Sequence, residues 1–171
     1  MRSKLFLTCT VLAALIAATL MTVRLAAQEP RGDATPIVRG ALSDTSLVQM
    51  LTDLGYEPKK LKQGYVVAIK DAEWTYNVQL LISANREKIG LNANVGTVDD
   101  VNAITAREWL GVLQANTDIA PSFFYFNKSN RVLYMHRVVD NRLVTSALLR
   151  RQIEAFTGNI KETADVWKFT K

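Results

Sequence analysis

The sequence predicts an α+β domain, in which a five-stranded antiparallel sheet is flanked by helices, mainly on one face. Two observations carry this prediction. Several short segments alternate apolar with polar residues, as strands with one packed and one solvated face do. Other segments place apolar residues at helical spacing and begin at recognisable capping residues. Along residues 44–167 the order of these segments is helix, three strands, helix, two strands, helix.

The first helix is expected to begin near Ser43 or Asp44, because either side chain can accept hydrogen bonds from the N–H groups of the first turn. Gly55 suits the left-handed residue that follows a helix, and Pro58 prevents the helix from resuming. The apolar stripe between these signals consists of Leu47, Met50, Leu51 and Leu54.

Three strands follow, and the second and third show the clearest alternation. The apolar positions are Trp74, Tyr76, Val78, Leu80 and Ile82 in the second, and Ile89, Leu91, Ala93 and Val95 in the third. The first strand, around residues 65–69, is apolar on both faces. Short polar connections between the three segments favour hairpins, so the sheet should be antiparallel.

The second helix opens at Thr105, and Glu108 lies three residues on, which is the pattern of a capping box. Its apolar stripe is predicted to be Ala106, Trp109, Leu110 and Leu113. Residues 123–126 and 132–139 form a second predicted hairpin. The last helix begins near Thr145, and Gly158 predicts a bend or break in it, since glycine disfavours a helix interior. The stripe of this helix is Leu149, Ile153, Phe156 and Ile160.

The start of the chain predicts export. Arg2 and Lys4 precede an uncharged, mostly apolar run of 19 residues, which is followed by Arg24, Leu25 and the small residues Ala26 and Ala27. This is the pattern of a secretory signal peptide, although the run is also long enough for an uncleaved signal anchor. We therefore expect a signal peptide or anchor at 1–27, a linker at 28–43 and the domain at 44–167. The location would be the periplasm or cell envelope, with membrane contact only through such an anchor.

The charge of the domain gives no indication of nucleic-acid binding. The chain has a formal charge of +5, but removing residues 1–27 would take away three of its 21 basic residues and none of its 16 acidic ones, which leaves +2. Nucleic-acid binders usually carry a concentrated basic face instead. Cleavage would also remove Cys9, the single cysteine. No spacing of ligand residues predicts a metal or a cofactor.

His136 is the sole histidine and the natural candidate for acid–base chemistry. Asp140 lies four residues further along the same strand, so about 13 Å would separate them, too far for a hydrogen bond. A surface histidine without a catalytic role is the better interpretation. A small exported enzyme that uses Asp140, His136 and Arg142 is the alternative. Residues 140–142 also read as a polar turn, in which Arg142 could bind a partner's carboxylate.

The polar face of the second and third strands is the leading candidate binding site. Its residues carry uncharged hydrogen-bonding side chains at every second position: Thr75, Asn77, Gln79, Asn92 and Asn94. An ordinary solvated face would explain them, because antiparallel sheets tolerate water on one side. The functional interpretation is a non-enzymatic module that binds a protein or peptide there, or a second copy of itself as a homodimer.

The order of elements also resembles a known family. The segments LVQMLTDLGYEP, EWTYNVQLLIS, SFFYFNKSNRVLYMHRVVDN and TSALLRRQIEAF resemble the YbjN-type family of bacterial sensory-transduction regulators. The resemblance covers most of residues 44–167 and implies a fold like that of type III secretion chaperones. It brings no catalytic residues. The predicted export signal sets this chain apart from many members of the family.

Overall fold

The computed structural model describes residues 40–71 and 74–170, and a six-stranded antiparallel sheet is its central feature. The strands lie side by side in the order β1-β2-β3-β4-β6-β5. They are β1 (Lys59–Lys60), β2 (Tyr65–Asp71), β3 (Trp74–Ile82), β4 (Lys88–Thr97), β5 (Ser122–Asn127) and β6 (Val132–Asp140). The helices are α2 (Asp44–Asp53), α3 (Ala106–Asp118), α4 (Ser146–Glu162) and α5 (Ala164–Trp167), with a short 3-10 turn, η1 (Val101–Ala103).

This architecture confirms the predicted α+β class, but the order of elements differs from the predicted one, because a strand, β1, is added after α2 and a short helix, α5, is added after α4. The predicted number of five strands was wrong, because Lys59 and Lys60 form β1 and pair with Val66 and Tyr65 of β2. Two exposed lysines give no apolar alternation from which a strand could be predicted. The signal segment at 1–27 and the beginning of the linker lie outside the described residues. Within the described part of the chain, no helix is long and apolar enough to cross a membrane.

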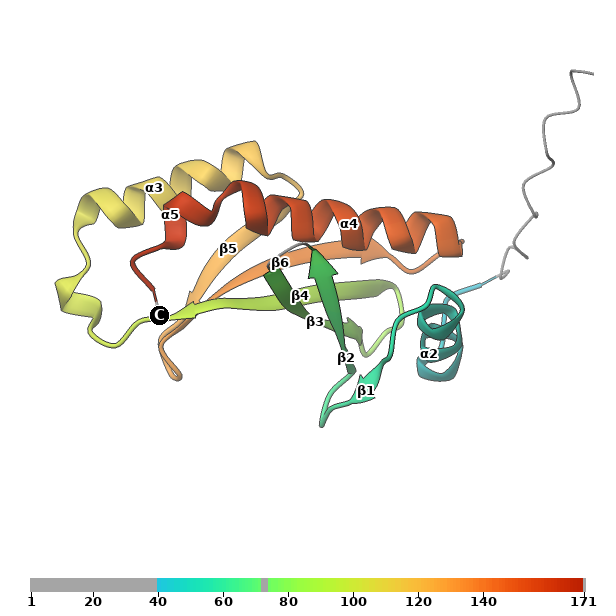
Figure 1. Cartoon of the computed structure of the whole chain (residues 1–171). Helices are drawn as coiled ribbons and strands as arrows, with labels where there is room; N and C mark the ends of the chain where they lie inside the picture. The colour runs from blue at the N-terminus through green and yellow to red at the C-terminus, as the bar shows by residue number, and fades with distance from the viewer. Residues whose placement is uncertain (1–39, 72–73, 171) are drawn as a thin grey trace, which may run out of the picture. The chain divides into compact units, whose positions relative to one another are not determined.

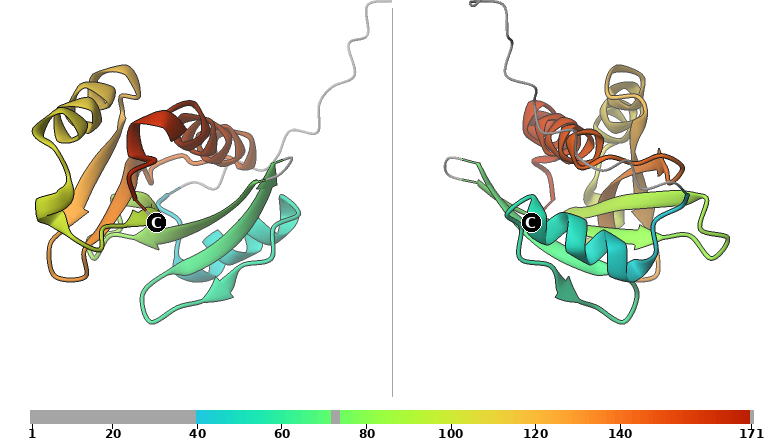
Figure 2. Two further views of the ribbon diagram at one scale, coloured as in Figure 1. Left: turned by 60° about the vertical axis from the view of Figure 1, so that its left-hand side comes forward. Right: turned by 90° about the vertical axis from the view of Figure 1, so that its right-hand side faces the viewer.

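The core lies between the helices and one face of the sheet. The strand residues Val67, Leu80 and Leu91 are fully buried on this face, and they share one apolar cluster with Leu51 of α2 and Phe156 of α4. Figure 1 shows α3, α4 and α5 together on one side of the sheet. In Figure 2, α2 lies beside β1 and β2, at the end of the sheet away from α3. We call the opposite surface of the sheet the open face.

Each of the three longer helices begins at a hydrogen-bonding cap. Ser43 accepts from the N–H of Ser46 at the start of α2, and Thr145 accepts from the N–H of Leu148 at the start of α4. The predicted capping box of α3 is confirmed, because Glu108 accepts the backbone N–H of Thr105 at 2.8 Å and Thr105 accepts that of Glu108. These bonds satisfy N–H groups that have no partner inside the helix.

The buried side of α3 differs from the predicted stripe. Leu110 and Leu113 are 56% and 62% exposed, whereas Val112 and Ala115 are buried. Trp109 is half-buried and packs against Phe126 and Phe169 at centroid distances of 5.3 and 5.6 Å. The prediction of Leu110 and Leu113 as core residues was wrong because the short helix has leucines on its solvated side as well.

The predicted break at Gly158 is also wrong. Helix α4 runs through Gly158 to Glu162, and the interruption comes at Thr163. There the Thr163 hydroxyl donates to the carbonyl of Asn159 at 2.6 Å, and α5 follows. Phe156 and Ile160 are buried before and after Gly158, so packing on both sides outweighs the intrinsic helix cost of glycine, about 1 kcal/mol.

Candidate functional site

The predicted polar residues all lie on the open face, but the sheet does not hold them in one continuous patch. Gln79 of β3 pairs directly with Asn92 of β4. The β3–β4 ladder ends at the pair Val78 and Ala93, so Asn77 and Asn94 are not cross-strand partners. Beyond this point β3 pairs with β2 alone and β4 pairs with β6 alone. The sheet therefore splits in the middle of the predicted site.

A group of aromatic side chains lies on the same open face, on β5 and β6. We call it the aromatic cluster: Phe123, Tyr125, Tyr134 and His136. The Tyr125 and Tyr134 rings stack at 5.2 Å with an angle of 15°, and the His136 ring meets Phe123 edge-on at 5.3 Å. Tyr125 donates its hydroxyl to the Asn92 amide oxygen at 3.3 Å, which joins the cluster to the predicted polar residues.

The sequence analysis did not predict this cluster. Strand β5 reads Ser-Phe-Phe-Tyr-Phe-Asn, so both of its faces are apolar and the alternation does not show which one is buried. In the structure Phe124 is buried, whereas Phe123 and Tyr125 are 40% and 38% exposed. One signal in the sequence could have indicated the cluster: strand β5 has more aromatic residues than its single buried face can hold.

His136 is a member of the aromatic cluster. Burial lowers the pKa of its imidazole, and a backbone hydrogen bond at Leu91 acts in the opposite direction. Its ring lies over Gly90, where a Cβ atom would come within 3.1 Å of the ring. The predicted surface position was therefore incomplete, because His136 is half-buried among aromatic neighbours.

Asp140 and Arg142 bind each other instead of joining His136. The Arg142 guanidinium donates to both carboxylate oxygens of Asp140, at 3.1 and 2.7 Å, and Lys88 lies 3.3 Å from the same carboxylate. These hydrogen bonds, those from Arg142 first, hold the pKa of Asp140 well below its usual range. The acid is thus ionised and paired at the end of β6. The structure therefore pairs Asp140 with Arg142 and places His136 among the rings of Phe123 and Tyr125.

The intervening Asn141 has a structural role. Its side chain is fully buried and bonds to the N–H and the carbonyl of Leu42 at 3.1 and 3.0 Å, and to the Arg86 carbonyl at 2.8 Å. One amide thus joins the segment that precedes α2, the β3–β4 turn and the end of β6. These hydrogen bonds give Asn141 a structural role in the turn at residues 140–142, and no bound ligand is needed to account for it. Arg142 itself is exposed, with its guanidinium occupied by Asp140.

A groove of about 750 Å³ runs along the outer edge of β2. Strand β1 pairs with Tyr65 and Val66 only, so the remainder of β2 is an uncovered edge. The groove is lined by residues of β2, of α4 and of the segment after α2, among them Tyr56, Lys59, Ile69, Lys70 and Glu154. Its walls carry charges of both signs.

A second hollow of about 340 Å³ lies where β3 and β4 part, and we call it the split pocket. From the predicted site it is lined by Thr75, Asn77 and Asn94, and from the helical side by Trp74, Tyr76 and Trp167. Three of the five predicted strand residues therefore meet at one cavity. No group of three His, Cys, Asp or Glu side chains in the described ranges is placed to hold a metal ion.

Comparisons with solved structures identify the fold. YbjN from E. coli is similar with a TM-score of 0.54 and 15% identity, over 74% of this chain and 96% of that one. A chain of the ExsC–ExsE complex is similar with a TM-score of 0.52 and 14% identity, over 70% and 89%. A chain of the HopA1–SchA chaperone–effector complex is similar with a TM-score of 0.50 and 13% identity, over 69% and 89%.

The protein therefore has a YbjN-type, type III secretion chaperone-like fold, as the sequence resemblance implied. At these identities the likeness concerns the fold alone. No protein-family model matches the sequence, and the search of curated proteins found no match.

Proposed function

We propose that this protein is a non-enzymatic binding module, exported to the cell envelope, which holds a protein or peptide partner on its open face. The main observation in support is that the fold leaves several aromatic and apolar side chains exposed on the open face. Phe123, Tyr125, Val138 of β6 and Leu81 of β3 are all between 38% and 43% exposed. Exposed apolar groups that gather on one surface are typical of interaction sites.

The composition of the open face fits a protein interface. Aromatic side chains are enriched at the centres of such interfaces, and charged side chains are depleted. The aromatic cluster adjoins the uncharged amides of Gln79 and Asn92, and the ion pair of Lys88 with Asp140 lies at the border of the face. Apolar rings beside neutral hydrogen-bonding groups can bind another protein surface without the cost of burying an unpaired charge.

The structural neighbours support this proposal at a coarser level. Two of the similar structures are complexes of proteins, one of them described as chaperone with effector. The separation of His136 from the Asp140–Arg142 pair argues against the enzyme alternative, in which all three would act on one substrate. A second copy of this chain is one partner that the open face could take, which would give the expected homodimer.

The test compares two matched double variants of the full chain. Asn77→Asp with Asn92→Asp places two charges on the open face, and Gln114→Asp with Thr117→Asp adds the same two charges on the exposed side of α3. Self-association is measured by sedimentation, and partner binding by pull-down from envelope extracts. We expect the first variant to lose association and the second to retain it. Loss in the second variant alone would assign binding to α3 and refute the proposal.

A further inference from the structure

The two edges of the sheet are protected to different degrees. At one edge, the Asn116 side chain of α3 accepts the backbone N–H of Phe124 in β5 at 2.6 Å and donates to its carbonyl at 3.4 Å. An amide side chain thus takes the place of a neighbouring strand there. At the other edge, β1 pairs only with Tyr65 and Val66, so no strand of the described ranges pairs with the outer side of β2 at residues 67–71. A free strand edge of this kind is a template for a further strand.

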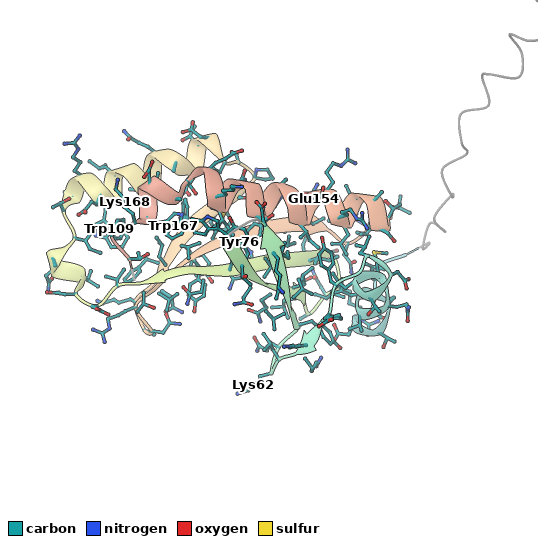
Figure 3. All side chains as sticks on the ribbon, in the orientation of Figure 1. Lys62, Tyr76, Trp109, Glu154, Trp167 and Lys168 are labelled. Carbon is teal, nitrogen blue, oxygen red and sulfur yellow. The ribbon has the colours of Figure 1, made fainter. Side chains whose placement is uncertain are left out.

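The groove of about 750 Å³ at this free edge has a wall on each side, and we call it the edge groove. One wall is α4, because Lys161 of this helix pairs with Asp71 at 3.0 Å and so places the end of β2 beside it (Figure 1). Glu154, which Figure 3 labels, lies on the same helix and lines the groove. The other wall is formed by residues 55–57 and 59. Between two walls, one extended segment fits better than the edge of a second sheet.

Gly158 is a glycine that the packing of the described residues does not explain. It lies inside α4, where glycine is less favourable than alanine, and a Cβ atom at this position would meet nothing within 4 Å. Gly158 is also one of the residues that line the edge groove. The helix thus leaves space on the wall of the groove at a cost to its own stability. Glycine in such a place allows the backbone of another chain to approach closely.

The charges of the edge groove distinguish the two sides of an added strand. Ala68 and Lys70 lie opposite open-face residues of β3, and Lys59 of β1 lies on the same side of the sheet, further along this edge. Neither lysine forms an ion pair with another described residue. On the opposite side, Ile69 packs against the core and Glu154 adds a negative charge. A complementary strand therefore carries acidic residues toward the open face and apolar residues toward α4.

We propose that the edge groove binds an extended segment of another protein, which adds to the sheet as a strand beside β2 and directs acidic side chains toward Lys59 and Lys70. In this mode of binding the main-chain hydrogen bonds supply affinity, and alternate side chains supply specificity. A second copy of this chain is the poorer occupant, because pairing of β2 with itself about Ile69 would bring the Lys70 side chains of both copies together. The site goes beyond the proposed function, since the aromatic cluster lies on β5 and β6, at the opposite end of the strand order.

The test is a titration of the full chain with an acidic peptide, Thr-Val-Glu-Val-Glu-Val-Thr, which is acetylated and amidated at its ends. Binding is followed by backbone amide chemical shifts and by hydrogen exchange. We expect shifts and slower exchange at residues 67–71, because main-chain groups of β2 gain partners. The basic peptide, with lysine in place of both glutamates, should bind at least about tenfold more weakly, since its charges meet the lysines of the groove. Equal binding of the two peptides, or binding of neither, would overturn the proposal.

Two methylated analogues of the acidic peptide test the strand geometry itself. In one analogue the backbone nitrogens of the glutamates carry methyl groups, and in the other those of the valines do. Only every second N–H of an added strand points toward β2, so one analogue should lose binding and the other should retain it. Equal binding of both analogues would show that the peptide does not add to the sheet.

Variants at two helix glycines locate the site and guard against misfolding. Gly158→Leu should raise the melting temperature, because leucine is the better helix former, and should weaken binding of the acidic peptide by at least about tenfold by filling the groove. Gly111→Leu in α3 is the matched control, since a Cβ atom there also meets nothing within 4 Å, and it should bind as the wild type does. Unchanged binding in Gly158→Leu, or an equal loss in both variants, would contradict the assignment.

A charge reversal tests the expected specificity. Lys70→Glu should reverse the preference between the acidic and the basic peptide, whereas Lys128→Glu in the β5–β6 turn should leave it unchanged. An unchanged preference in Lys70→Glu would refute the predicted orientation of the acidic residues.

Failure of this inference is distinguishable from failure of the proposed function. Tyr125→Asp charges the aromatic cluster and leaves the lining of the edge groove unchanged, so it should bind the acidic peptide as the wild type does. Partner association that is lost in Tyr125→Asp, together with no peptide binding by the wild type, would retain the open face as a binding surface and refute the strand site. Peptide binding together with association that survives Tyr125→Asp would retain the strand site and refute the proposed function.

Discussion

The two faces of the β5–β6 hairpin place similar residues in opposite environments. Phe124 and Met135 face the helices and are buried, whereas their neighbours Phe123 and His136 face away from the helices among other aromatic rings. Phe124 and Met135 are part of the hydrophobic core, and their apolar character follows from that position. The second pair stabilises the fold much less, because part of each side chain remains accessible to solvent. The comparison shows that aromatic content alone does not separate packing from binding, and the location of the helices does.

The largest expected effect lies on the covered face. Phe156 of α4 is fully buried in the core cluster, so Phe156→Ala should lower the free energy of unfolding by about 3–5 kcal/mol. Tyr125→Ala on the open face removes a ring that is partly solvated and should cost about 1 kcal/mol or less. Denaturant melts of both variants measure the difference. Equal losses would mean that the aromatic cluster is a second core and not a free surface.

A smaller effect distinguishes two neighbours at the end of β6. Asn141→Ala would leave the N–H and carbonyl of Leu42 and the carbonyl of Arg86 without their buried partner, and should cost roughly 2–3 kcal/mol. Arg142→Ala, one residue further, removes an exposed guanidinium and should shift the melting midpoint much less. A larger shift for Arg142→Ala would show that the surface ion pair, and not the buried amide, holds this corner together.

The smallest expected effect is the dependence of the protein's stability on pH that His136 causes. Because burial depresses the pKa of His136 below 6.5, the folded protein binds that proton less readily than the unfolded chain does. Stability from this source is therefore complete above about pH 6.5, and it declines as the pH falls through the lowered folded value. His136→Gln removes the sole histidine and should flatten the melting temperature between pH 5 and 7. An unchanged pH profile in this variant would place His136 in contact with water in both states.

The helices and strands could be predicted from the sequence because capping residues and apolar–polar alternation are local signals. Thr105 with Glu108 marked the start of α3, and the polar positions of β3 and β4 marked the open face before the helices were placed. Other features depend on distant partners. Leu110 and Leu113 could not be recognised as exposed until the contacts of Trp109 with Phe126 and Phe169 fixed the rotation of α3.

The candidate site was predictable in part for the same reason. Period-two spacing placed Thr75, Asn77, Gln79, Asn92 and Asn94 on one face, but it assumed a continuous ladder. The ladder ends at Val78 and Ala93, and an irregularity between Asn94 and Gly96 shifts β4 against β6. Gly96 was the available signal for the irregularity, because glycine inside a strand often marks a bulge, whereas the end of the ladder leaves no signature in the residues. The aromatic cluster depends in turn on β5 and β6 pairing so that Tyr125 lies opposite Tyr134, which only the register reveals.

The most direct test of the account is site-specific photocrosslinking from the two exposed surfaces of the full chain. A photoreactive phenylalanine analogue replaces Tyr125 on the open face or Leu113 on α3, positions that are both exposed but lie on opposite sides of the sheet. After irradiation of cells that produce each variant, adducts are resolved by mass. We predict a discrete protein adduct from position 125 and none from position 113. Adducts from position 113 alone would contradict the claim that the open face is the binding surface.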